Sequence, residues 1–371
     1  MNHAEPAWLV HGRLLTPTGI RRGAVGIRGH RIVEVSRQPS RSGRRVDARG
    51  CYIVPGLIDL HVWGDPDLVA RDAVRAGTTA FLSAIGPASP EELAKQFVRH
   101  AARRSEHAGA ECLGIHLEGP FINPARGGAL ASRWLRPPRL KELSRLHRAG
   151  RGALKLVTIA PELPGGARAI RWCAAHGVVA SMGHSAASAE QAATAAEAGA
   201  RAVTHVFNGM APLHHRHPGL MDAALTDDRL TAMVILDGVH VSPQAFQLLV
   251  RCKGPARIVL VTDSIRRQAG SGGPRFLRSA QARGGAFYTT SGRLAGSRLT
   301  MLEAVRNAAR FGKMNLADAV RMATANPARL LGMERERGAL LPGRRADLAV
   351  FDERFRVRMT WVAGRIVYQR G

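Results

Sequence analysis

The strongest constraint on the fold is an alternation of short apolar segments with alanine-rich segments across residues 55–334. The apolar segments have strand length, and helical stretches such as 91–107, 138–149, 167–176 and 187–198 separate them. The eight predicted strands end at His61, Ala84, Glu118, Ile159, Gly183, His205, Leu236 and Asp263. Alternating β and α units form parallel strands, and eight such units favour a (β/α)8 TIM-type barrel over an open sheet.

The two ends of the chain have a different sequence pattern from residues 55–334. Short strand-like runs at 7–15, 24–28 and 31–35 resemble those at 346–351, 357–362 and 365–368. We therefore expect residues 1–54 and 335–371 to meet as one small β-sandwich domain beside a barrel of residues 55–334. The Gly-, Ser- and Arg-rich segment 266–293 predicts a long loop over the barrel mouth, followed by a helix at 299–311.

Composition excludes several classes of protein. The formal net charge is +26, from 54 Lys+Arg and 28 Asp+Glu, but the basic residues are spread along the chain and only 5% of residues are aromatic. Nucleic-acid binders tend to concentrate their basic residues and to offer stacking platforms, so we expect no specific nucleic-acid partner. The charge is compatible with a small anionic substrate.

Targeting and redox signals are sparse. No uninterrupted apolar run approaches the ~18 residues of a membrane span, so no membrane association is expected. The cysteines are Cys51, Cys112, Cys173 and Cys252, which form no CxxC pair. This spacing fits neither a disulfide framework nor a zinc ribbon, and it predicts a reducing, cytoplasmic location.

Metal-ligand and acid–base residue types lie at the predicted strand ends. They are His61, Glu118, His184, His205 and Asp263, with His240 shortly after the seventh strand. Each has a structural alternative, because Asp263 could cap a helix and Glu118 could belong to a turn. The carboxyl ends of barrel strands meet at one face, so their coincidence favours a shared cavity. The nearby segment 214–217, His-His-Arg-His, is either a substrate contact or only a basic loop.

Three of these side chains form a typical catalytic metal set. Two imidazoles and a carboxylate bind Zn²⁺ while leaving one position open for water, which then loses a proton near neutral pH. We expect Glu118, His184 and His205 to hold one divalent metal, with Asp263 orienting the water and moving its proton. Zn²⁺ is the commonest metal for such a set, and Fe²⁺ or Co²⁺ are the alternatives.

Motifs along nearly the whole chain point to one family. They read VPGLIDLHVWG at 54–64, HLEGPFINPARGG at 116–128, MGHS at 182–185, THVFNGMAP at 204–212, HRHPGL at 215–220, DGVH at 237–240, LVTDS at 260–264, LAGSRLTM at 294–301 and PGRRADLAVFD at 342–352. In this set and order the chain resembles N-acetylglucosamine-6-phosphate deacetylases of the amidohydrolase superfamily.

The resemblance implies a role for each matching residue. Glu118, His184 and His205 would bind the metal, and Asp263 would act as general base and then as acid for the leaving amine. The sugar phosphate would be held by Asn208, Gly209, Arg216 and His240. The resemblance also implies a homodimer, in which part of this basic set can come from the neighbouring subunit.

The chain departs from the family pattern at three places. Strand one reads His61-Val62-Trp63 where many relatives have His-x-His, so a second metal is not expected, while His61 could contact either the metal or Asp263. Leu130 stands where the family usually has a histidine that polarises the amide carbonyl or positions the sugar. Arg266-Arg267 follow Asp263 closely, and they either bind a more anionic substrate or are solvated.

The combined signals predict a metal-dependent hydrolase that deacetylates an N-acetyl amino-sugar phosphate, N-acetylglucosamine 6-phosphate first of all. One alternative keeps the chemistry but changes the substrate to another, biosynthetic N-acyl compound. A less favoured alternative is an inactive barrel that binds sugar phosphates and regulates.

Overall fold

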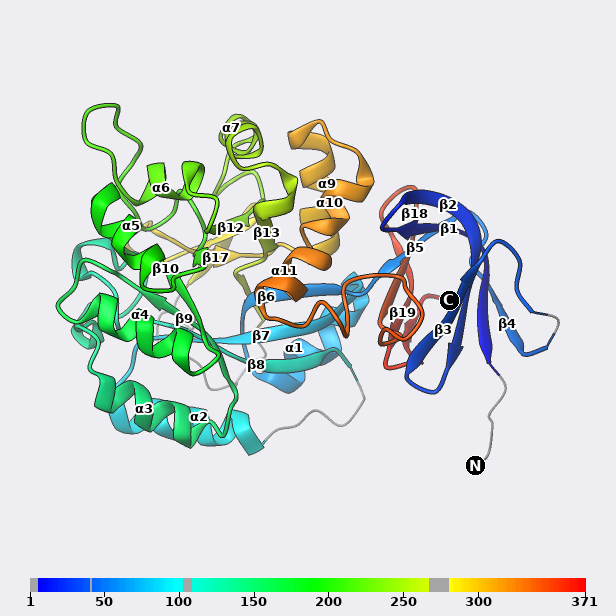
Figure 1. The fold of residues 1–371 in the computed structure, drawn as a ribbon, viewed down its shortest axis with the longest axis horizontal. Coiled ribbons are helices and arrows are strands. Elements are labelled where there is room, and N and C mark those ends of the chain that lie inside the picture. Colours follow the sequence, from blue (N-terminus) through cyan, green and yellow to red (C-terminus); the bar gives the residue numbers. More distant parts are fainter. Residues whose placement is uncertain (1–5, 41, 103–108, 267–279) are drawn as a thin grey trace.

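The computed structural model describes residues 6–40, 42–102, 109–266 and 280–371, and two sheets organise them (Figure 1). The larger sheet curls into a barrel with helices around it. The smaller sheet stands beside the barrel and contains strands from both ends of the chain. The predicted combination of a (β/α)8 barrel and a terminal β unit is confirmed.

The barrel strands follow one another in sequence order, and every neighbouring pair is parallel. They are β6 (Leu57–Trp63), β7 (Thr78–Ile85), β8 (Glu111–Glu118), β9 (Leu154–Ile159), β10 (Val179–Met182), β11 (Ala202–Val203), β12 (Thr231–Ile235) and β13 (Ile258–Val261). The chain then continues into the short β14 (Ser264–Ile265), which pairs in parallel with β6. This pairing closes the barrel, and the eight predicted strands all lie where the apolar runs placed them.

Helices cover the outside of the barrel. They are α1 (Pro66–Ala73), α2 (Pro90–Ala102), α3 (Leu140–Ala149), α4 (Gly166–Ala175), α5 (Ala189–Glu197), α6 (Leu220–Thr226), α7 (Pro243–Lys253), α9 (Met301–Gly312), α10 (Leu316–Arg321) and α11 (Ala325–Leu330). Local sequence sets several starts: Ser188 and Thr300 begin α5 and α9 with reciprocal capping boxes. None of the helices in these described residues combines the length and hydropathy needed to cross a membrane.

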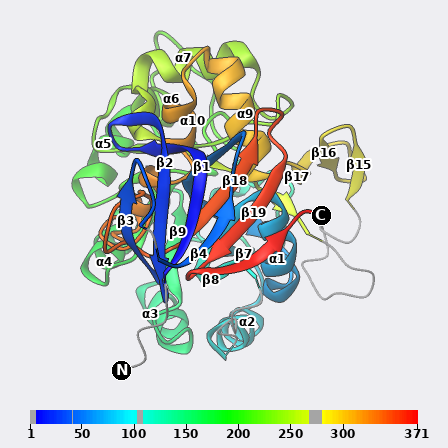
Figure 2. The same cartoon turned by 90° about the vertical axis from the view of Figure 1, so that its right-hand side faces the viewer.

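The smaller sheet joins the two ends of the chain. Its strands are β1 (Ala7–Thr16), β2 (Gly19–Arg28), β3 (Arg31–Ser36), β4 (Arg44–Asp47), β5 (Cys51–Pro55), β18 (Leu348–Asp352), β19 (Val357–Val362) and β20 (Arg365–Gln369). The antiparallel pair β5–β18 links the two groups, which lie together in Figure 2. One core contains Leu9 and Val25 from the first group and Val350 and Trp361 from the second.

The segment after the barrel differs from its prediction. The predicted loop at 266–293 is wrong for its described part, because β15 (Gln281–Arg283) and β16 (Ala286–Tyr288) form an antiparallel hairpin that continues to β17 (Leu294–Ser297). The two-residue Gly284-Gly285 connection is the local signal for this hairpin, since paired glycines suit tight β-turns. Residues 267–279, including Arg267, lie outside the described residues.

Candidate active site

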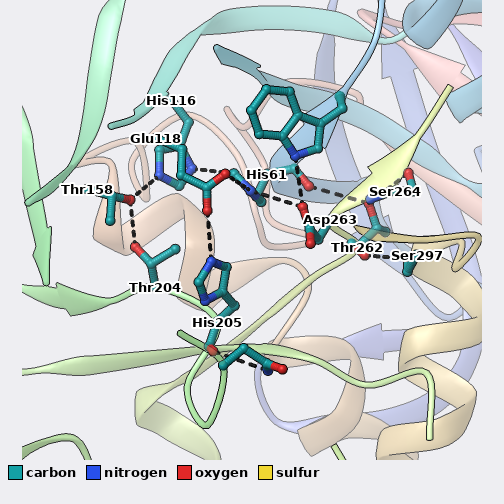
Figure 3. A network of polar contacts seen from close by, with 12 residues as sticks. His61, His116, Glu118, Thr158, Thr204, His205, Thr262, Asp263, Ser264 and Ser297 are labelled. Carbon is teal, nitrogen blue, oxygen red and sulfur yellow. Dashed lines mark hydrogen bonds and ion pairs between the residues drawn. The ribbon is translucent and has the colours of Figure 1, made fainter. Parts of the chain in front are cut away.

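Five of the predicted residues meet at one end of the barrel. Glu118 ends β8, His184 and His205 follow β10 and β11, His61 lies near the end of β6, and Asp263 separates β13 from β14. Parallel strands put all these positions at the carboxyl face, where barrel active sites are built. Figure 3 shows Glu118 between His61 and His205, with Asp263 on the far side of His61.

Glu118 is the centre of a three-residue cluster. Its Oε1 lies 3.1 Å from Nε2 of His184 and 2.8 Å from Nε2 of His205. One ligand atom from each residue lies within 4.8 Å of the others, and all three side chains are buried. The donor set of two imidazoles and one carboxylate is the set that catalytic Zn²⁺ sites use. The cluster therefore fits one divalent metal ion.

The electrostatics of this cluster favour positive charge. Burial raises the pKa of Glu118, but the charge of His61 and the hydrogen bonds from the histidines outweigh it and hold that pKa well below its usual range. Burial lowers the pKa of His61, yet the carboxylates of Glu118 and Asp263 raise it to about 10. The pKa of His184 is also raised, chiefly by Glu118 against the effect of burial. Buried carboxylates that stabilise a proton in this way would also stabilise a metal cation.

Asp263 lies beside the cluster and is reachable from the barrel mouth. Its side chain is 13% exposed, whereas that of Glu118 is 4% exposed. Its Oδ1 lies 3.1 Å from Nε2 of His61 and accepts a hydrogen bond of 2.9 Å from Nε1 of Trp63. The backbone is fixed as well, because Asp263 N donates to the carbonyl of His61 and Asp263 O accepts from the amide of Ser297, both at 2.9 Å.

Unusual backbone conformations mark the same residues. His184, His205 and Asp263 have φ values of 48°, 29° and 48°, in the left-handed region that non-glycine residues rarely adopt. Each such residue costs on the order of 1–3 kcal/mol, and such strain clusters at functional sites. Gly209 has φ of 64°, and a Cβ there would lie 2.8 Å from Nδ1 of His184, so only glycine fits. In the structure, Gly209 is therefore required for a steric reason, because a side chain there would clash with His184.

A buried network supports His61 from behind (Figure 3). Nδ1 of His61 lies 2.8 Å from Nδ1 of His116, whose Nε2 lies 2.8 Å from Oγ1 of Thr158. Thr158 continues the chain to Thr204 at 2.9 Å. Sequence reasoning missed these residues. The available signal was spacing, because His116 stands two positions before Glu118 on one strand and so shares its face.

The predicted substrate-binding residues are placed differently from one another. His240 is buried against Asp237, with Nδ1 2.7 Å from Oδ2, and Asp237 was also missed by sequence reasoning. Asn208 is half-buried and donates to the carbonyls of His205 and Val206, so it braces the loop after β11.

The basic loop after β11 lies at the surface. Arg216 is exposed and its Nη1 lies 2.9 Å from Nε2 of His215. Within the described part of the chain, the structure gives no hydrogen bond or ion pair between Arg216 and the cluster. The chain thus brings His240 and Asn208 towards the cluster region but leaves Arg216 in the exposed loop.

The departures from the family pattern that the structure describes are Trp63, Leu130 and Arg266. Leu130 is buried in an apolar cluster that also contains Trp63, Ile265 and Phe287. Arg266 is half-buried, and its Nη2 donates to the carbonyl of Leu299 at 3.3 Å. The residues that replace polar groups of the pattern therefore form one apolar wall.

Comparisons with known proteins point to the same kind of enzyme as the geometry of the site. Residues 52–367 match the Amidohydrolase family. The N-acetylglucosamine-6-phosphate deacetylase of Bacillus subtilis (strain 168) is 32% identical over 370 residues, which cover 94% of this chain and 93% of the relative. The N-acetylgalactosamine-6-phosphate deacetylase of Escherichia coli O157:H7 is 36% identical over 330 residues, covering 85% and 87%.

A solved structure is similar over almost its full length. The N-acetyl-D-glucosamine-6-phosphate deacetylase of Mycobacterium smegmatis, a mutant in complex with N-acetyl-D-glucosamine-6-phosphate, has a TM-score of 0.88 and 34% sequence identity. The match covers 98% of this chain and 100% of that one. The similarity therefore includes both the barrel and the terminal sheet.

Proposed function

The chain belongs to the amidohydrolase family, and from this premise we propose that it hydrolyses N-acetylglucosamine 6-phosphate to glucosamine 6-phosphate and acetate. The observation that carries the proposal is the meeting of Glu118, His184 and His205 with Asp263 at the carboxyl face of one barrel. The full-length similarity to deacetylases that act on this substrate supports the same activity.

Glu118, His184 and His205 would hold one divalent metal, and we propose Zn²⁺, with Fe²⁺ or Co²⁺ as alternatives. When bound, such an ion polarises the amide carbonyl and lowers the pKa of water. His184 is oriented for this by its second nitrogen, since Nδ1 lies 2.6 Å from the carbonyl of Arg126. His61 lies close enough to Glu118 and Asp263 to contact the ion or to stay a partner of Asp263, and we propose the second role.

Asp263 performs the proton transfers of the reaction. It removes a proton from water while the water oxygen bonds to the acetyl carbonyl carbon. The C–N bond then breaks, and Asp263 returns that proton to the departing nitrogen. The acid formed loses its proton to give acetate and an ammonium group, so the enzyme ends in its starting state. His61 keeps the Asp263 carboxylate in place through Oδ1 throughout.

The sugar phosphate would be bound by His240, Asn208, the backbone of Gly209 and Arg216. Asp237 holds Nδ1 of His240, which leaves Nε2 available to a substrate oxygen. An arginine fork suits phosphate geometry. We propose a homodimer in which the exposed loop that carries Arg216 reaches the neighbouring site. Because all four cysteines are unpaired, we propose a cytoplasmic location.

The direct test is the isosteric variant Asp263→Asn with N-acetylglucosamine 6-phosphate. We expect kcat to fall by about 10³-fold or more, because the general base is lost, while the metal content by elemental analysis stays that of the wild type. Asp352→Asn in the terminal sheet is the matched control and should keep full activity. Full activity of Asp263→Asn would refute its role, and a metal-free, inactive wild-type protein would favour a regulatory, sugar-phosphate-binding barrel.

A second candidate keeps the chemistry but changes the N-acyl substrate. The apolar wall with Leu130 favours it, as does the likeness to an N-acetylgalactosamine-6-phosphate deacetylase. A side-by-side assay of both N-acetylhexosamine 6-phosphates and a panel of other N-acyl compounds separates the two. Robust turnover of N-acetylglucosamine 6-phosphate would dispose of this candidate.

The proposal that Arg216 completes the site of the neighbouring subunit can be tested by mixing two inactive variants. Arg216→Ala and Asp263→Asn proteins are combined under conditions that exchange subunits. If Arg216 acts across the interface, hybrid dimers contain one intact site and regain activity that neither parent has. No recovery, together with a monomeric mass in solution, would contradict the proposed dimer.

A further inference from the structure

Trp63 occupies a position that a metal-binding role cannot explain. It is the last residue of β6, only 2% exposed, and its indole nitrogen has no lone pair for a metal. Its Nε1 donates a hydrogen bond of 2.9 Å to Oδ1 of Asp263. Its ring also meets the ring of His61 edge-on, with centroids 5.8 Å apart. Trp63 therefore touches both the catalytic acid and that acid's imidazole partner.

The two carboxylate oxygens of Asp263 have different surroundings. Oδ1 receives the indole N–H of Trp63 and lies 3.1 Å from Nε2 of His61. Among the described residues, no side chain makes a hydrogen bond or ion pair with Oδ2. The hydrogen bond from Trp63 and the ion pair with His61 both act on Oδ1, and they fix the rotation of the carboxylate about its terminal bond, which is otherwise broad. Oδ2 is thereby left as the oxygen that can take a proton from water.

The indole itself is held in place by packing. It lies in the apolar cluster with Ala84, Leu130 and Ile265. A Cβ on Gly86 would lie 2.9 Å from Cη2 of Trp63, so the absence of a side chain at position 86 makes room for the ring. Leu130 borders the same space, because its Cδ2 would lie 3.8 Å from that Cβ. Two of the three departures from the family pattern, Trp63 and Leu130, are thus one structural unit.

We propose that Trp63 is a positioning residue for Asp263, whose indole N–H holds Oδ1 so that Oδ2 faces the reacting water. The inference rests on the proposed role of Asp263 as the proton acceptor. Partners that orient a reacting group typically contribute about 10–100-fold to activity. Because the indole N–H of Trp63 is bound to Asp263, we expect its loss to lower kcat more than it changes KM.

The activity test removes the indole N–H while it keeps an aromatic ring at position 63. Trp63→Phe keeps an aromatic ring in the cluster, and we expect kcat to fall by about 10–100-fold with KM within about twofold of the wild type. Trp8→Phe is the matched control, since Nε1 of Trp8 donates at 3.1 Å to the carbonyl of Ser42 in the terminal sheet. It should leave both constants unchanged. An unchanged kcat in Trp63→Phe, or an equal loss in Trp8→Phe, would overturn the proposal.

A spectroscopic test does not depend on turnover. In a ¹⁵N-labelled protein each of the five tryptophans gives one indole N–H signal, and Trp63→Phe identifies the signal of Trp63 by its loss. We expect Asp263→Ala to move that signal upfield, because the carboxylate acceptor is gone, while Asp352→Ala leaves it in place. A signal that does not move would overturn the inference even if Asp263→Ala is inactive. Conversely, an active Asp263→Ala protein would refute the proposed function itself.

Discussion

The two ends of β8 each carry a glutamate, and the two side chains have different partners. Glu118 at the carboxyl end contacts the imidazoles of His61, His184 and His205. Glu111 at the amino end instead accepts from guanidinium groups, with Oε2 2.9 Å from Nη2 of Arg337 and 2.8 Å from Nη2 of Arg345. One strand thus carries part of the candidate active site at one end and a set of permanent ion pairs at the other.

The arginine end joins the barrel to the terminal sheet. Arg345 also pairs with Asp347 at 3.0 Å, just before β18, and Arg337 lies 3.5 Å from the same carboxylate. Burial raises the pKa of Asp347 although Arg337 opposes it. Burial lowers the pKa of Arg337, but the surrounding carboxylates raise it overall. Arginine stays protonated in proteins, so these pairs can only stabilise the structure.

The partner of each glutamate decides whether it can take part in chemistry. An imidazole can give up its proton and bind a metal, whereas a guanidinium can do neither. This division agrees with the general asymmetry of barrels, in which the carboxyl face carries catalysis and the amino face carries stability.

The largest effect is expected from the same isosteric change, glutamate to glutamine, at both ends of β8. Glu118→Gln should lower kcat by on the order of 10⁴-fold, because the metal set is lost. In the metal-free protein, its effect on the free energy of unfolding should be small, since the histidines can lose their protons. Glu111→Gln should keep kcat but cost roughly 1–3 kcal/mol. Steady-state kinetics and urea unfolding measure both, and an inactive, stable Glu111→Gln protein would contradict the assignment.

The arginine end can be tested alone with Arg337→Met. This variant leaves Asp347 buried with one partner fewer, and breaking a buried ion pair costs about 3–5 kcal/mol. Arg356→Met is the control, because Arg356 pairs with Asp352 at the surface and such pairs contribute about 0–1 kcal/mol. Equal destabilisation of the two variants would show that the buried network adds nothing.

Metal removal should act at the carboxyl end only. A chelator should abolish activity, and added Zn²⁺ at a hundred times its Kd should raise the stability of the apo-protein by about 2.7 kcal/mol. Calorimetry should show this gain in the wild type and in Glu111→Gln but not in Glu118→Gln. The same gain in Glu118→Gln would place the metal elsewhere.

A smaller effect is expected for the ion pair of Asp237 and His240. As at the carboxyl end of β8, a carboxylate pairs with an imidazole, and as at the amino end, the pair is an ion pair that stabilises the fold. Burial opposes both shifts, yet the pair raises the pKa of His240 above 6.5 and lowers that of Asp237 below 3.8. The contribution of His240 is complete below pH 6.5 and is lost as pH rises through its folded pKa. That of Asp237 is complete above pH 3.8 and is lost as pH falls through its own.

Asp237→Asn should therefore cost most between these two values. We expect a loss of roughly 1.5–3 kcal/mol near pH 5 that shrinks at alkaline pH. Unfolding at several pH values measures it, with Asp228→Asn as control, because exposed Asp228 pairs with Arg257, which does not titrate in this range. A loss that stays constant with pH would mean that the pair does not titrate as described.

The barrel, the pairing of the chain ends and the positions of the candidate site residues could all be predicted from the sequence. Strand order, helix positions and the places of Glu118, His184, His205 and Asp263 follow from local apolar runs and their polar ends, and local patterns survive in a barrel whose neighbours are also neighbours in sequence. The hairpin at 281–288 was not predicted, although the Gly284-Gly285 pair is a sequence signal for a tight β-turn.

The contacts between these residues could not be predicted from the sequence, because they depend on the closed barrel. Trp63 and Asp263 are 200 positions apart, and they meet because β14 pairs with β6 to close the barrel. The left-handed backbone at Asp263 is likewise a property of the closed barrel rather than of local sequence. The sequence pattern predicts which side chains reach the carboxyl face of the barrel. Which group donates a hydrogen bond to which carboxylate oxygen depends on long-range packing, and no local pattern encodes that packing.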